Sequence, residues 1–277
     1  MTDSPPLVLL TDFGSRDWYA GVMQGVIASI APGCSVIALT HEIEPGNVAH
    51  GAWVLREQFR HFPAGAVFCC IVDPKVGMAR RAMAMRGAFE RREYRFIAPD
   101  NGLLDPIRRL LSPCEARELQ NAAWLYGSGS NTFHGRDVFA PAAAHWLAGE
   151  DFTQCGPEMP DPVELRLPEP VLKSGRPAEI LAQIMHVDHF GNAVLNLSRE
   201  WTEQHCPSGA TLVWQTANGE RVALRRTFAE ASPDKPLIYW GSDGALEIGV
   251  NLGDAAKRFN LRIGGAVKLD VNEAGTK

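Results

Sequence analysis

One stretch of the sequence decides the fold of this chain: residues 66–81 read A-V-F-C-C-I-V-D-P-K-V-G-M-A-R-R. Residues 66–72 are continuously apolar and rich in β-branched side chains, which is typical of a buried parallel strand. The run ends at Asp73, so a carboxylate stands at the carboxyl end of a strand, where open α/β sheets bind ligands. Arg80 is near enough through a short loop to return and pair with Asp73. The alternative is a structural Asp73 that caps a turn, with Arg80 solvated.

Short apolar runs on either side of this stretch repeat the pattern. We expect further strands at 7–10, 36–39 and 94–98, separated by helical periodicity at 17–30 and 47–59. This β-α-β order predicts an α/β domain with a mainly parallel sheet and right-handed crossovers. Four polar side chains follow strands that end at one edge of this sheet, although each of them alone is also a common turn residue: Asp12, His41, Asp73 and Asp100.

Two helical segments complete the expected first domain. The helix at 17–30 has its apolar side chains on one face: Tyr19, Val22, Met23, Val26, Ile27 and Ile30. Residues 131–141 indicate a polar, Gly-containing loop before an Ala-rich helix that ends near Leu147. His134 beside this helix N-terminus is well placed to handle a proton or an anion. The alternative is that Asp137 caps the helix and His134 binds neighbouring backbone.

A Pro-rich segment divides the chain. Six prolines between residues 156 and 177 exclude a helix or a central strand there. We therefore expect an N-terminal α/β domain at 1–160, a linker at 161–177 and a smaller C-terminal domain at 178–277. Seven short runs separated by Gly, Asn or Asp follow the linker and predict an antiparallel β-barrel or sandwich: 179–187, 194–197, 211–214, 221–224, 237–240, 246–250 and 266–271.

The composition excludes several classes of protein. With 277 residues, 45% of them hydrophobic and 21% charged, the chain can bury the cores of two globular domains. A net charge of -5 without a basic stripe argues against nucleic acid as a partner. No stretch is long and apolar enough to span a membrane, and M-T-D-S-P-P at the N-terminus lacks the features of a signal peptide. We therefore expect a cytoplasmic protein with no membrane partner.

Neither the cysteines nor the histidines form a metal-binding pattern. The six cysteines lack C-x-x-C spacing, and the eight histidines lack H-E-x-x-H spacing. We expect reduced thiols, no metal and no cofactor. The fragments D-F-G at 12–14 and H-G-R-D at 134–137 stand in the wrong order for a protein kinase, without a Gly-rich phosphate loop before them. The G-x-S-x-G motif of serine hydrolases is also missing.

Seven motifs, taken in order, resemble one family of enzymes. They are T-D-F-G at 11–14, T-H-E-I at 40–43, V-D-P-K-V-G at 72–77, A-P-D-N-G-L-L at 98–104, T-F-H-G-R-D-V-F-A-P at 132–141, D-H-F-G-N-A-V-L-N at 188–196 and G-S-D-G-A-L-E-I-G-V-N at 241–251. From Leu7 to about Arg258 the chain is similar to the S-adenosylmethionine hydroxide adenosyltransferases. These are adenosine-forming hydrolases of S-adenosylmethionine, related to fluorinating and chlorinating enzymes. The resemblance implies an N-terminal α/β domain, a C-terminal β-barrel and a homotrimer with active sites between the N-domain of one subunit and the C-domain of the next.

The resemblance also implies the reaction and its catalytic residues. Water or hydroxide attacks C5′ of the ribose of S-adenosyl-L-methionine, which expels methionine and leaves adenosine. The family's catalytic set falls on Asp73, Arg80 and His134. His134 is suited to accept the proton of the water or to hold the water, Arg80 to stabilise developing hydroxide, and Asp73 to fix Arg80. Which of them removes the proton stays open.

The substrate-binding positions are likewise implied by the resemblance. Asp12 corresponds to the residue that binds the ribose hydroxyls. Asp188 and Asn192, with Ser242 nearby, correspond to the residues that meet the methionine amino and carboxylate groups. Phe190 falls where the adenine ring stacks. The remaining implied substrate-binding residues are Glu247, Val250 and Leu252.

Two alternatives to a hydrolase follow from the same motifs. The first is a halide-using adenosyltransferase, which is disfavoured because the halogenating relatives carry Tyr where Asp73 stands and Thr where Val76 stands. The second is a catalytically silent protein that binds S-adenosylmethionine or adenosine. Lys75 replaces the usual Gly of this motif and Met78 a common Thr, and Lys75 adds bulk and positive charge beside a site for a cationic substrate. Turnover distinguishes the silent protein from the enzyme.

Overall fold

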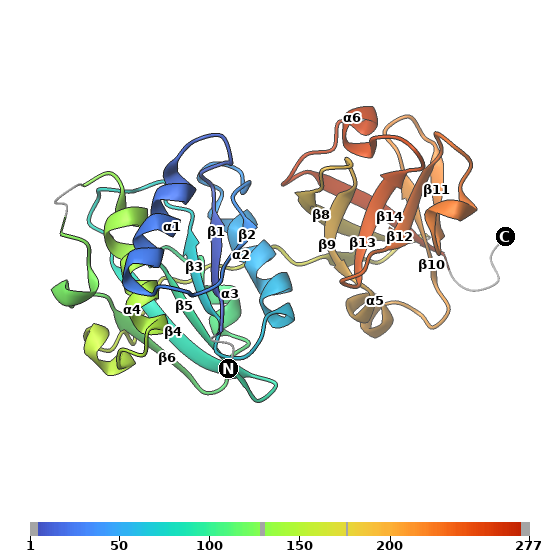
Figure 1. The fold of residues 1–277 in the computed structure, drawn as a ribbon. Coiled ribbons are helices and arrows are strands. Elements are labelled where there is room, and N and C mark those ends of the chain that lie inside the picture. The colour runs from blue at the N-terminus through green and yellow to red at the C-terminus, as the bar shows by residue number, and fades with distance from the viewer. Residues whose placement is uncertain (1–4, 128–130, 176, 273–277) are drawn as a thin grey trace. The chain divides into compact units, whose positions relative to one another are not determined.

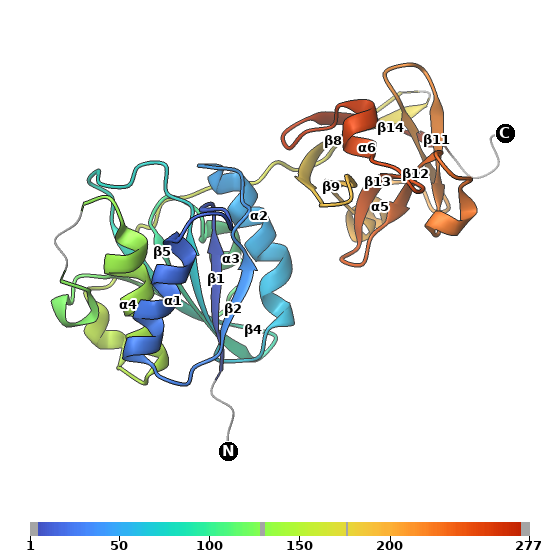
Figure 2. The ribbon, with the colours of Figure 1, turned by 45° about the horizontal axis from the view of Figure 1, so that its top comes forward.

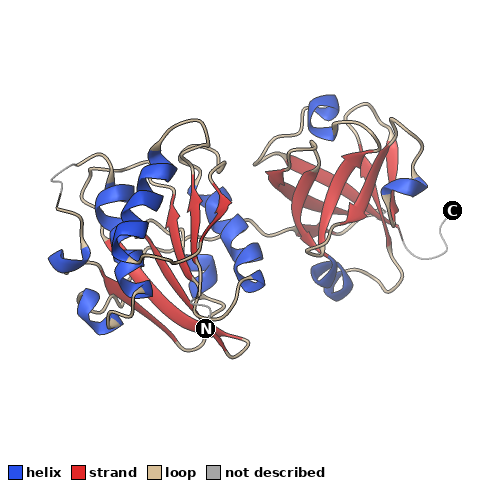
Figure 3. Ribbon diagram, viewed as in Figure 1, coloured by secondary structure: helices blue, strands red, loops and turns tan. Residues whose placement is uncertain are grey.

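The computed structural model describes residues 5–127, 131–175 and 177–272. The N-terminal residues 1–4, which entered the prediction of a cytoplasmic protein, and residue 176 of the expected linker lie outside the described residues. The chain divides into two compact units, Met1–Leu167 and Pro168–Lys277 (Figure 1). The first unit combines helices with a sheet, whereas the second consists mostly of strands (Figure 3).

The first unit is built on a six-stranded sheet with the strand order β2-β1-β3-β5-β4-β6. Four neighbouring strands run parallel: β1 Leu7–Thr11, β2 Val36–Thr40, β3 Val67–Ile71 and β5 Arg92–Pro99. Every residue of β1 and β3 is buried, because these central strands are covered on both faces. The mainly parallel α/β sheet predicted from the sequence is confirmed.

Two antiparallel strands complete this sheet and are missing from the sequence prediction: β4 Ala82–Phe89 and β6 Cys114–Glu118. β4 forms a hairpin with β5 through Glu90 and Arg91, whose φ angles are 49° and 65°. Two-residue turns with positive φ at both positions are usually made by Asn and Gly. The dipeptide E-R carries no such signal, so the hairpin is not recognisable in the sequence.

Helices cover both faces of the sheet (Figure 2). Their apolar side chains join two core clusters on opposite sides of β1 and β3, because successive strand residues point to opposite faces. One face is covered by α1 Tyr19–Ile30 and α4 Ala140–Leu147, and the other by α2 Val48–Gln58 and the short α3 Asp105–Arg108. Three 3₁₀ turns lie between these elements: η1 Phe59–His61, η2 Ala122–Trp124 and η4 Phe152–Cys155.

α1 begins at Tyr19, two residues later than the sequence indicates. Met23 and Ile27 of this helix are fully buried, but Tyr19 is 39% exposed. Tyr19 belongs to the apolar face that the sequence predicts, but it is not buried with Met23 and Ile27. Its ring packs instead against Phe13 and Phe133, with centroid distances of 5.9 and 5.1 Å.

The polar loop predicted before α4 is partly helical, so that prediction is wrong over η3 Gly135–Phe139, a π-helical turn that runs directly into α4. A π-turn has no sequence period that distinguishes it from a loop with scattered apolar residues. The N-cap residues of η3 and α4 make no side-chain cap bond, and Asp137 binds the Arg136 side chain. The alternative in which Asp137 caps the helix is thus wrong as well.

The second unit is a barrel with the strand order β14-β10-β11-β12-β13-β9-β8-β7, closed by pairing of β14 with β8. The predicted C-terminal β-barrel is confirmed, and the one departure from antiparallel pairing is the parallel pair β11–β12. The sequence prediction lacks β7 and the short helices α5, η5 and α6. The elements of the second unit are β7 Val171–Lys173, β8 Ala178–Val187, β9 Ala193–Ser198, α5 Arg199–His205, β10 Thr211–Gln215, β11 Arg221–Arg225, η5 Phe228–Glu230, β12 Pro236–Trp240, β13 Ala245–Val250, α6 Ala255–Phe259 and β14 Ala266–Asn272.

Two predictions about the class of protein concern thiols and membrane spans. All six cysteines are free thiols. Cys69 and Cys70 are fully buried in β3, and burial raises the pKa of both, so they are unreactive core residues. Among the described residues, no helix has the length and apolar character needed to cross a membrane.

The segment 161–167 runs along the first unit and is fixed by a buried carboxylate, Asp100. The backbone N–H of Val163 donates to Asp100 Oδ1 at 2.7 Å. Arg81 Nε donates to Asp100 Oδ2 at 2.9 Å, and Arg81 Nη1 donates to Asp161 at 2.8 Å. Asp100, one of the four polar residues at strand ends, therefore anchors the chain that leads to the second unit.

Asp105→Ala is expected to destabilise the first unit. The Asp105 carboxylate is fully buried and accepts hydrogen bonds from Leu165 N–H at 3.0 Å and from the side chains of Arg108 and Arg109. Burial alone would raise the pKa of Asp105, but these hydrogen bonds outweigh it and lower the pKa. Removal of the carboxylate takes away the shared partner of three donors, so the free energy of unfolding in urea should fall by about 2–4 kcal/mol.

The matched control is Asp161→Ala, which also removes a carboxylate from an arginine but at a side chain that is 75% exposed. We expect only a small loss there, because water replaces the partner. Because the pKa of Asp105 is lowered, its contribution is present above the unfolded-state pKa and is lost as the pH falls through the folded-state pKa. Equal losses in both variants would contradict the assignment.

Candidate active site

Two carboxylates lie together at the carboxyl edge of the parallel strands. β1 and β3 are neighbours with Thr11 opposite Ile71, so the residues that follow them reach the same side of the sheet. A cavity of about 310 Å³ opens at this place, lined by side chains from the segments 12–19, 71–76 and 132–135. Asp12, Asp73 and His134 all line it. Three of the sequence-predicted site residues therefore share one cavity.

Arg80 returns across the loop 73–80 to pair with Asp73. Its Nε donates to Asp73 Oδ2 at 2.6 Å, and its Nη2 contacts the same oxygen. The side chains of Arg80 and Asp73 are 10% and 5% exposed, so the alternative of a solvated Arg80 is wrong. The second carboxylate oxygen, Oδ1, accepts the backbone N–H of Lys75 at the longer distance of 3.3 Å.

The loop 73–80 packs against the segment that carries His134. Gly77 in this loop has a φ of 81°, and a Cβ atom there would lie 2.8 Å from the backbone oxygen of Asn131. Side chains do not approach a backbone oxygen so closely, so the contact and the backbone conformation both require Gly. The Asp73–Arg80 pair and His134 are thereby held at a fixed separation.

His134 meets the ion pair through Arg80. Arg80 Nη2 lies 2.9 Å from His134 Nδ1. Since a guanidinium group only donates, Nδ1 is the acceptor, and the neutral ring carries its proton on Nε2. Burial and then the positive charge of Arg80 lower the pKa of His134. At neutral pH His134 is therefore an uncharged donor at Nε2.

The π-helical turn η3 packs against Arg80 through Phe139. The guanidinium carbon of Arg80 lies 5.0 Å from the centre of the Phe139 ring, at the end of η3. This cation–π contact and the Asp73 carboxylate both stabilise the positive charge of the guanidinium group. At the start of the turn, a Cβ on Gly135 would lie 3.1 Å from both Met23 Sδ and the Phe133 ring, so the close packing requires Gly.

Asp12 is half-buried and lines the same cavity. Its Oδ2 accepts the backbone N–H of Gly46 at 2.8 Å. Burial raises the pKa of Asp12, the Gly46 bond opposes this, and the charge of Asp73 raises the pKa further. The neighbouring negative charge makes ionisation of Asp12 more costly, and a cationic ligand would offset this cost.

Three aromatic residues form the apolar wall and are absent from the sequence-predicted site: Phe13, Tyr19 and Phe133. Phe13 and Phe133 adjoin the predicted residues Asp12 and His134 directly, inside the T-D-F-G and T-F-H-G motifs. Their place beside polar site residues was the available signal. Tyr19 gave none, because its spacing fits the buried face of α1.

Two of the four polar residues at strand ends lie outside the cavity lining. His41 Nδ1 lies 2.9 Å from Thr11 Oγ1, and the His41 carbonyl accepts the N–H of Gly14, so His41 braces the chain around Asp12. Burial lowers the pKa of His41. Asp100 anchors the segment 161–167, as described above. A shared sheet edge therefore does not by itself place a residue in the site.

The remaining predicted residues lie in the second unit, and four of them line a separate cavity. This cavity of about 530 Å³ is lined by Phe190, Asn192, Val250 and Leu252 among others. Asp188 organises one of its walls, because its Oδ1 accepts the backbone N–H groups of Phe190 and Asn192 and its Oδ2 accepts the Asn192 side chain at 2.9 Å. Phe190 and Leu252 are 73% and 83% exposed, which is unusual for such large apolar side chains.

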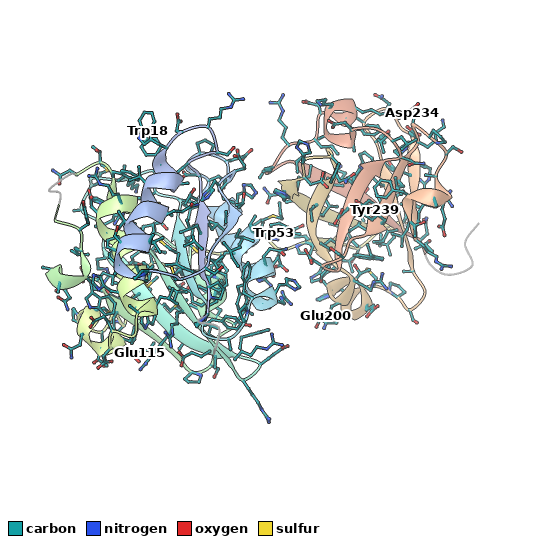
Figure 4. The ribbon with its side chains drawn as sticks, viewed as in Figure 1. Trp18, Trp53, Glu115, Glu200, Asp234 and Tyr239 are labelled. Carbon is teal, nitrogen blue, oxygen red and sulfur yellow. The ribbon has the colours of Figure 1, made fainter. Side chains whose placement is uncertain are left out.

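Glu247 and Ser242 do not line this second cavity. Ser242 lies in the turn between β12 and β13. Glu247 on β13 accepts a short hydrogen bond from the hydroxyl of Tyr239, a residue of β12 labelled in Figure 4. Burial, opposed by the Tyr239 bond, raises the pKa of Glu247, and burial also raises that of Tyr239. Glu247 is thus committed to a partner within the barrel.

The first cavity combines groups suited to a reaction of a small nucleophile with a cation. The neutral His134, held by Arg80, supplies a donor, Asp73 supplies a carboxylate whose Oδ1 accepts one long hydrogen bond, and three rings give the cavity an apolar wall. Among the described residues, no cluster of three His, Cys, Asp or Glu side chains has the arrangement of a metal site.

Comparisons with known proteins give a consistent result over the whole chain. Residues 7–156 match the family model of the SAM hydroxide adenosyltransferase N-terminal domain, and residues 182–268 match that of the C-terminal domain. A protein of Thermus thermophilus named (R)-S-adenosyl-L-methionine hydrolase is 40% identical over 95% of this chain and 99% of its own. A fluorinase of Actinoplanes sp. is 28% identical over 94% of this chain and 96% of its own. The crystal structure of an uncharacterized conserved protein from Thermotoga maritima matches with a TM-score of 0.85 and 31% identity, covering 95% of this chain and 99% of that one.

The imidazole of His134 is expected to titrate below pH 6.5, the usual value for histidine. Burial and the neighbouring Arg80 disfavour the charged ring, so the neutral form persists as the pH falls until the lowered pKa is reached. An NMR titration of the histidine Hε1 signals measures this, with His134→Gln identifying the resonance. A pKa at or above 6.5 would contradict the assigned tautomer, since protonated Nδ1 cannot accept from Arg80.

Proposed function

The chain belongs to the SAM hydroxide adenosyltransferase family, and on that ground we propose that it hydrolyses (R)-S-adenosyl-L-methionine to adenosine and L-methionine. A relative with 40% identity over nearly its whole length carries the name of this activity. The observation in this chain that carries the proposal is the contact set of Asp73, Arg80 and His134. Asp73 and His134 line one cavity with Asp12, and Arg80 pairs with both of them from behind the lining. This set supplies what attack by water requires and leaves room for a nucleoside.

The reaction needs help mainly on the side of the nucleophile. The oxygen of water forms a bond to C5′, the C5′–S bond breaks, and its electron pair returns to sulfur. The sulfonium becomes the neutral thioether of methionine, so the leaving group requires no acid. Water must instead be aligned with the C–S bond and must lose one proton.

The proposed roles follow from which atoms are already occupied. Arg80 and the Nε2–H of His134 donate to the water oxygen and hold it in line. His134 Nδ1 is engaged by Arg80, and Nε2 carries a proton, so the ring is poorly placed to accept another. Asp73 lines the cavity and its Oδ1 accepts one long hydrogen bond, so we assign Oδ1 as the acceptor of the proton. Asp12, which lines the same cavity, is assigned to the ribose hydroxyls.

The second unit is proposed to supply the remaining substrate contacts. Asp188, Asn192 and Ser242 meet the amino and carboxylate groups of methionine, and the exposed Phe190 stacks on adenine. We assign these contacts to the neighbouring subunit of a cytoplasmic homotrimer. Val250 and Leu252 add to the lining of the same cavity, and Glu247 is assigned a supporting role through its bond to Tyr239. The large exposed fractions of Phe190 and Leu252 support burial against a partner or ligand.

Halide as the nucleophile is disfavoured by the charge at position 73. The Asp73 carboxylate lines the cavity and repels an anion approaching C5′, whereas neutral water gains a hydrogen-bond acceptor there. Lys75 in the same loop is exposed to solvent and does not line the cavity. Its position supports a working site over a silent one.

Hydrolysis in oxygen-18 water is expected to place one heavy oxygen at C5′ of the adenosine product. The purified protein is incubated with each sulfur epimer of the substrate, and mass spectrometry follows the adenosine. We expect turnover of the (R) epimer in preference. Asp73→Asn, which cannot take the proton, and His134→Ala, which cannot hold the water, should each lower kcat at least about 100-fold.

Asp161→Asn is the matched control, since Asp161 also pairs with an arginine but lies on the surface outside the cavity. It should retain the activity. Adenosine released by Asp73→Asn at the wild-type rate would remove Asp73 from the mechanism. A folded wild-type protein that binds the substrate without releasing adenosine would refute the hydrolase and establish the silent binding protein.

Shared active sites predict that two inactive variants rescue each other. In a trimer assembled from equal amounts of Asp73→Asn and Asp188→Ala chains, about a quarter of the sites combine two intact halves. Mixing after dissociation should therefore restore about a quarter of the wild-type activity. A site contained in one chain gives no recovery, and gel filtration at the mass of a single 30.3 kDa chain would refute the trimer directly.

A further inference from the structure

The aromatic wall of the first cavity consists of three rings in mutual contact. The ring centroid of Tyr19 lies 5.1 Å from that of Phe133 and 5.9 Å from that of Phe13, and Phe13 and Phe133 are 6.3 Å apart. The interplanar angle is 88° for Tyr19 with Phe133 and 71° for Phe13 with Phe133, so both pairs meet edge to face and are not stacked. We call these residues the aromatic cluster. Trp18 touches Tyr19 but is 69% exposed and lies on the outside of the loop before α1 (Figure 4).

The charges around the aromatic cluster favour a positive ligand. Asp12 and Asp73 line the same cavity, and among the described residues that line it there is no lysine or arginine. His134 is the one basic side chain in the lining that the structure describes, and its position beside Arg80 keeps it neutral. Ring faces attract cations through their quadrupole, and the attraction is strongest where water is excluded. Rings and carboxylates together select for positive charge.

We propose that the aromatic cluster of Phe13, Tyr19 and Phe133 recognises the sulfonium cation of the substrate and discriminates it from a neutral thioether. The inference rests on the proposed function. Phe13 follows the proposed ribose ligand Asp12, and Phe133 precedes the proposed water ligand His134. Sulfur is bonded to C5′, so a ribose held at Asp12 places the sulfur in the cavity that the three rings line.

The proposal has a consequence for the order of events. The cation–π attraction exists while sulfur is charged and vanishes when the C5′–S bond has broken. The aromatic cluster therefore holds the substrate but not the methionine product, whose sulfur is neutral. It contributes to substrate affinity and to product release rather than to stabilisation of the transition state.

Binding of two uncleaved analogues tests this directly. S-adenosylhomocysteine has a neutral thioether at the position of the sulfonium, and sinefungin has a protonated amine there. Isothermal titration calorimetry gives the ratio of their dissociation constants, and we expect wild type to bind sinefungin more tightly. Tyr19→Leu and Phe133→Leu should each reduce this preference about three- to tenfold, because the leucine keeps apolar contact without a ring face. Tyr19→Phe is the matched control and should keep the preference.

Each outcome bears on one proposal or the other. If Tyr19→Leu and Phe133→Leu leave the ratio of the two dissociation constants unchanged, the rings act only as an apolar wall and the inference is overturned. Wild-type protein that prefers sinefungin but releases no adenosine from S-adenosylmethionine would refute the hydrolase and leave cation recognition standing. Two variants at different positions guard against a single misfolded chain, and circular dichroism checks each of them.

Discussion

The ion pair of Asp73 and Arg80 is the interaction on which the rest of the site depends. Both side chains are largely removed from water, so their mutual attraction and their hydrogen bonds must offset a desolvation cost of several kcal/mol for each ion. Three contacts of Arg80 offset this desolvation cost: the Asp73 carboxylate, His134 Nδ1 and the face of the Phe139 ring. A carboxamide or a shorter cation at these positions would leave a buried charge without its partner. The loop, the imidazole and the π-helical turn are therefore coupled through one guanidinium group.

That coupling also determines the protonation of the cavity. Because Arg80 donates to His134 Nδ1, protonation of this nitrogen would place two cationic donors face to face. Burial acts in the same direction on His134 and in the opposite sense on Asp12, whose pKa it raises. Burial thus disfavours the charged form of each of the two groups. A cationic ligand reverses the balance at Asp12 by favouring its ionised form.

Much of this arrangement follows from short-range sequence features. The apolar run before Asp73 and the number of residues to Arg80 predict a strand end with a returning arginine, and the β-α-β order predicts which strand ends share an edge. The hairpin through Glu90 and Arg91 is not predictable, because its backbone is imposed by strand pairing and not by the residues of the turn. The place of Tyr19 in the cavity wall is not predictable for a related reason. Helical periodicity assigns a face, but packing against Phe13 and Phe133 decides whether that face meets the core or a cavity.

The chemistry assigned to this cavity requires its catalytic power to come from the side of the nucleophile. Asp12, Asp73 and the aromatic cluster all stabilise a positive sulfur, and each of these attractions weakens as the C5′–S bond breaks. Left alone they would favour the bound substrate over the transition state and slow the reaction. The donors of Arg80 and His134 and the acceptor Asp73 Oδ1 gain strength as water gives up its proton, which is the opposite dependence. A site with this division of roles binds its substrate through charge and accelerates the reaction through alignment of the water and transfer of its proton. Loss of Asp73 therefore weakens substrate binding and proton transfer together.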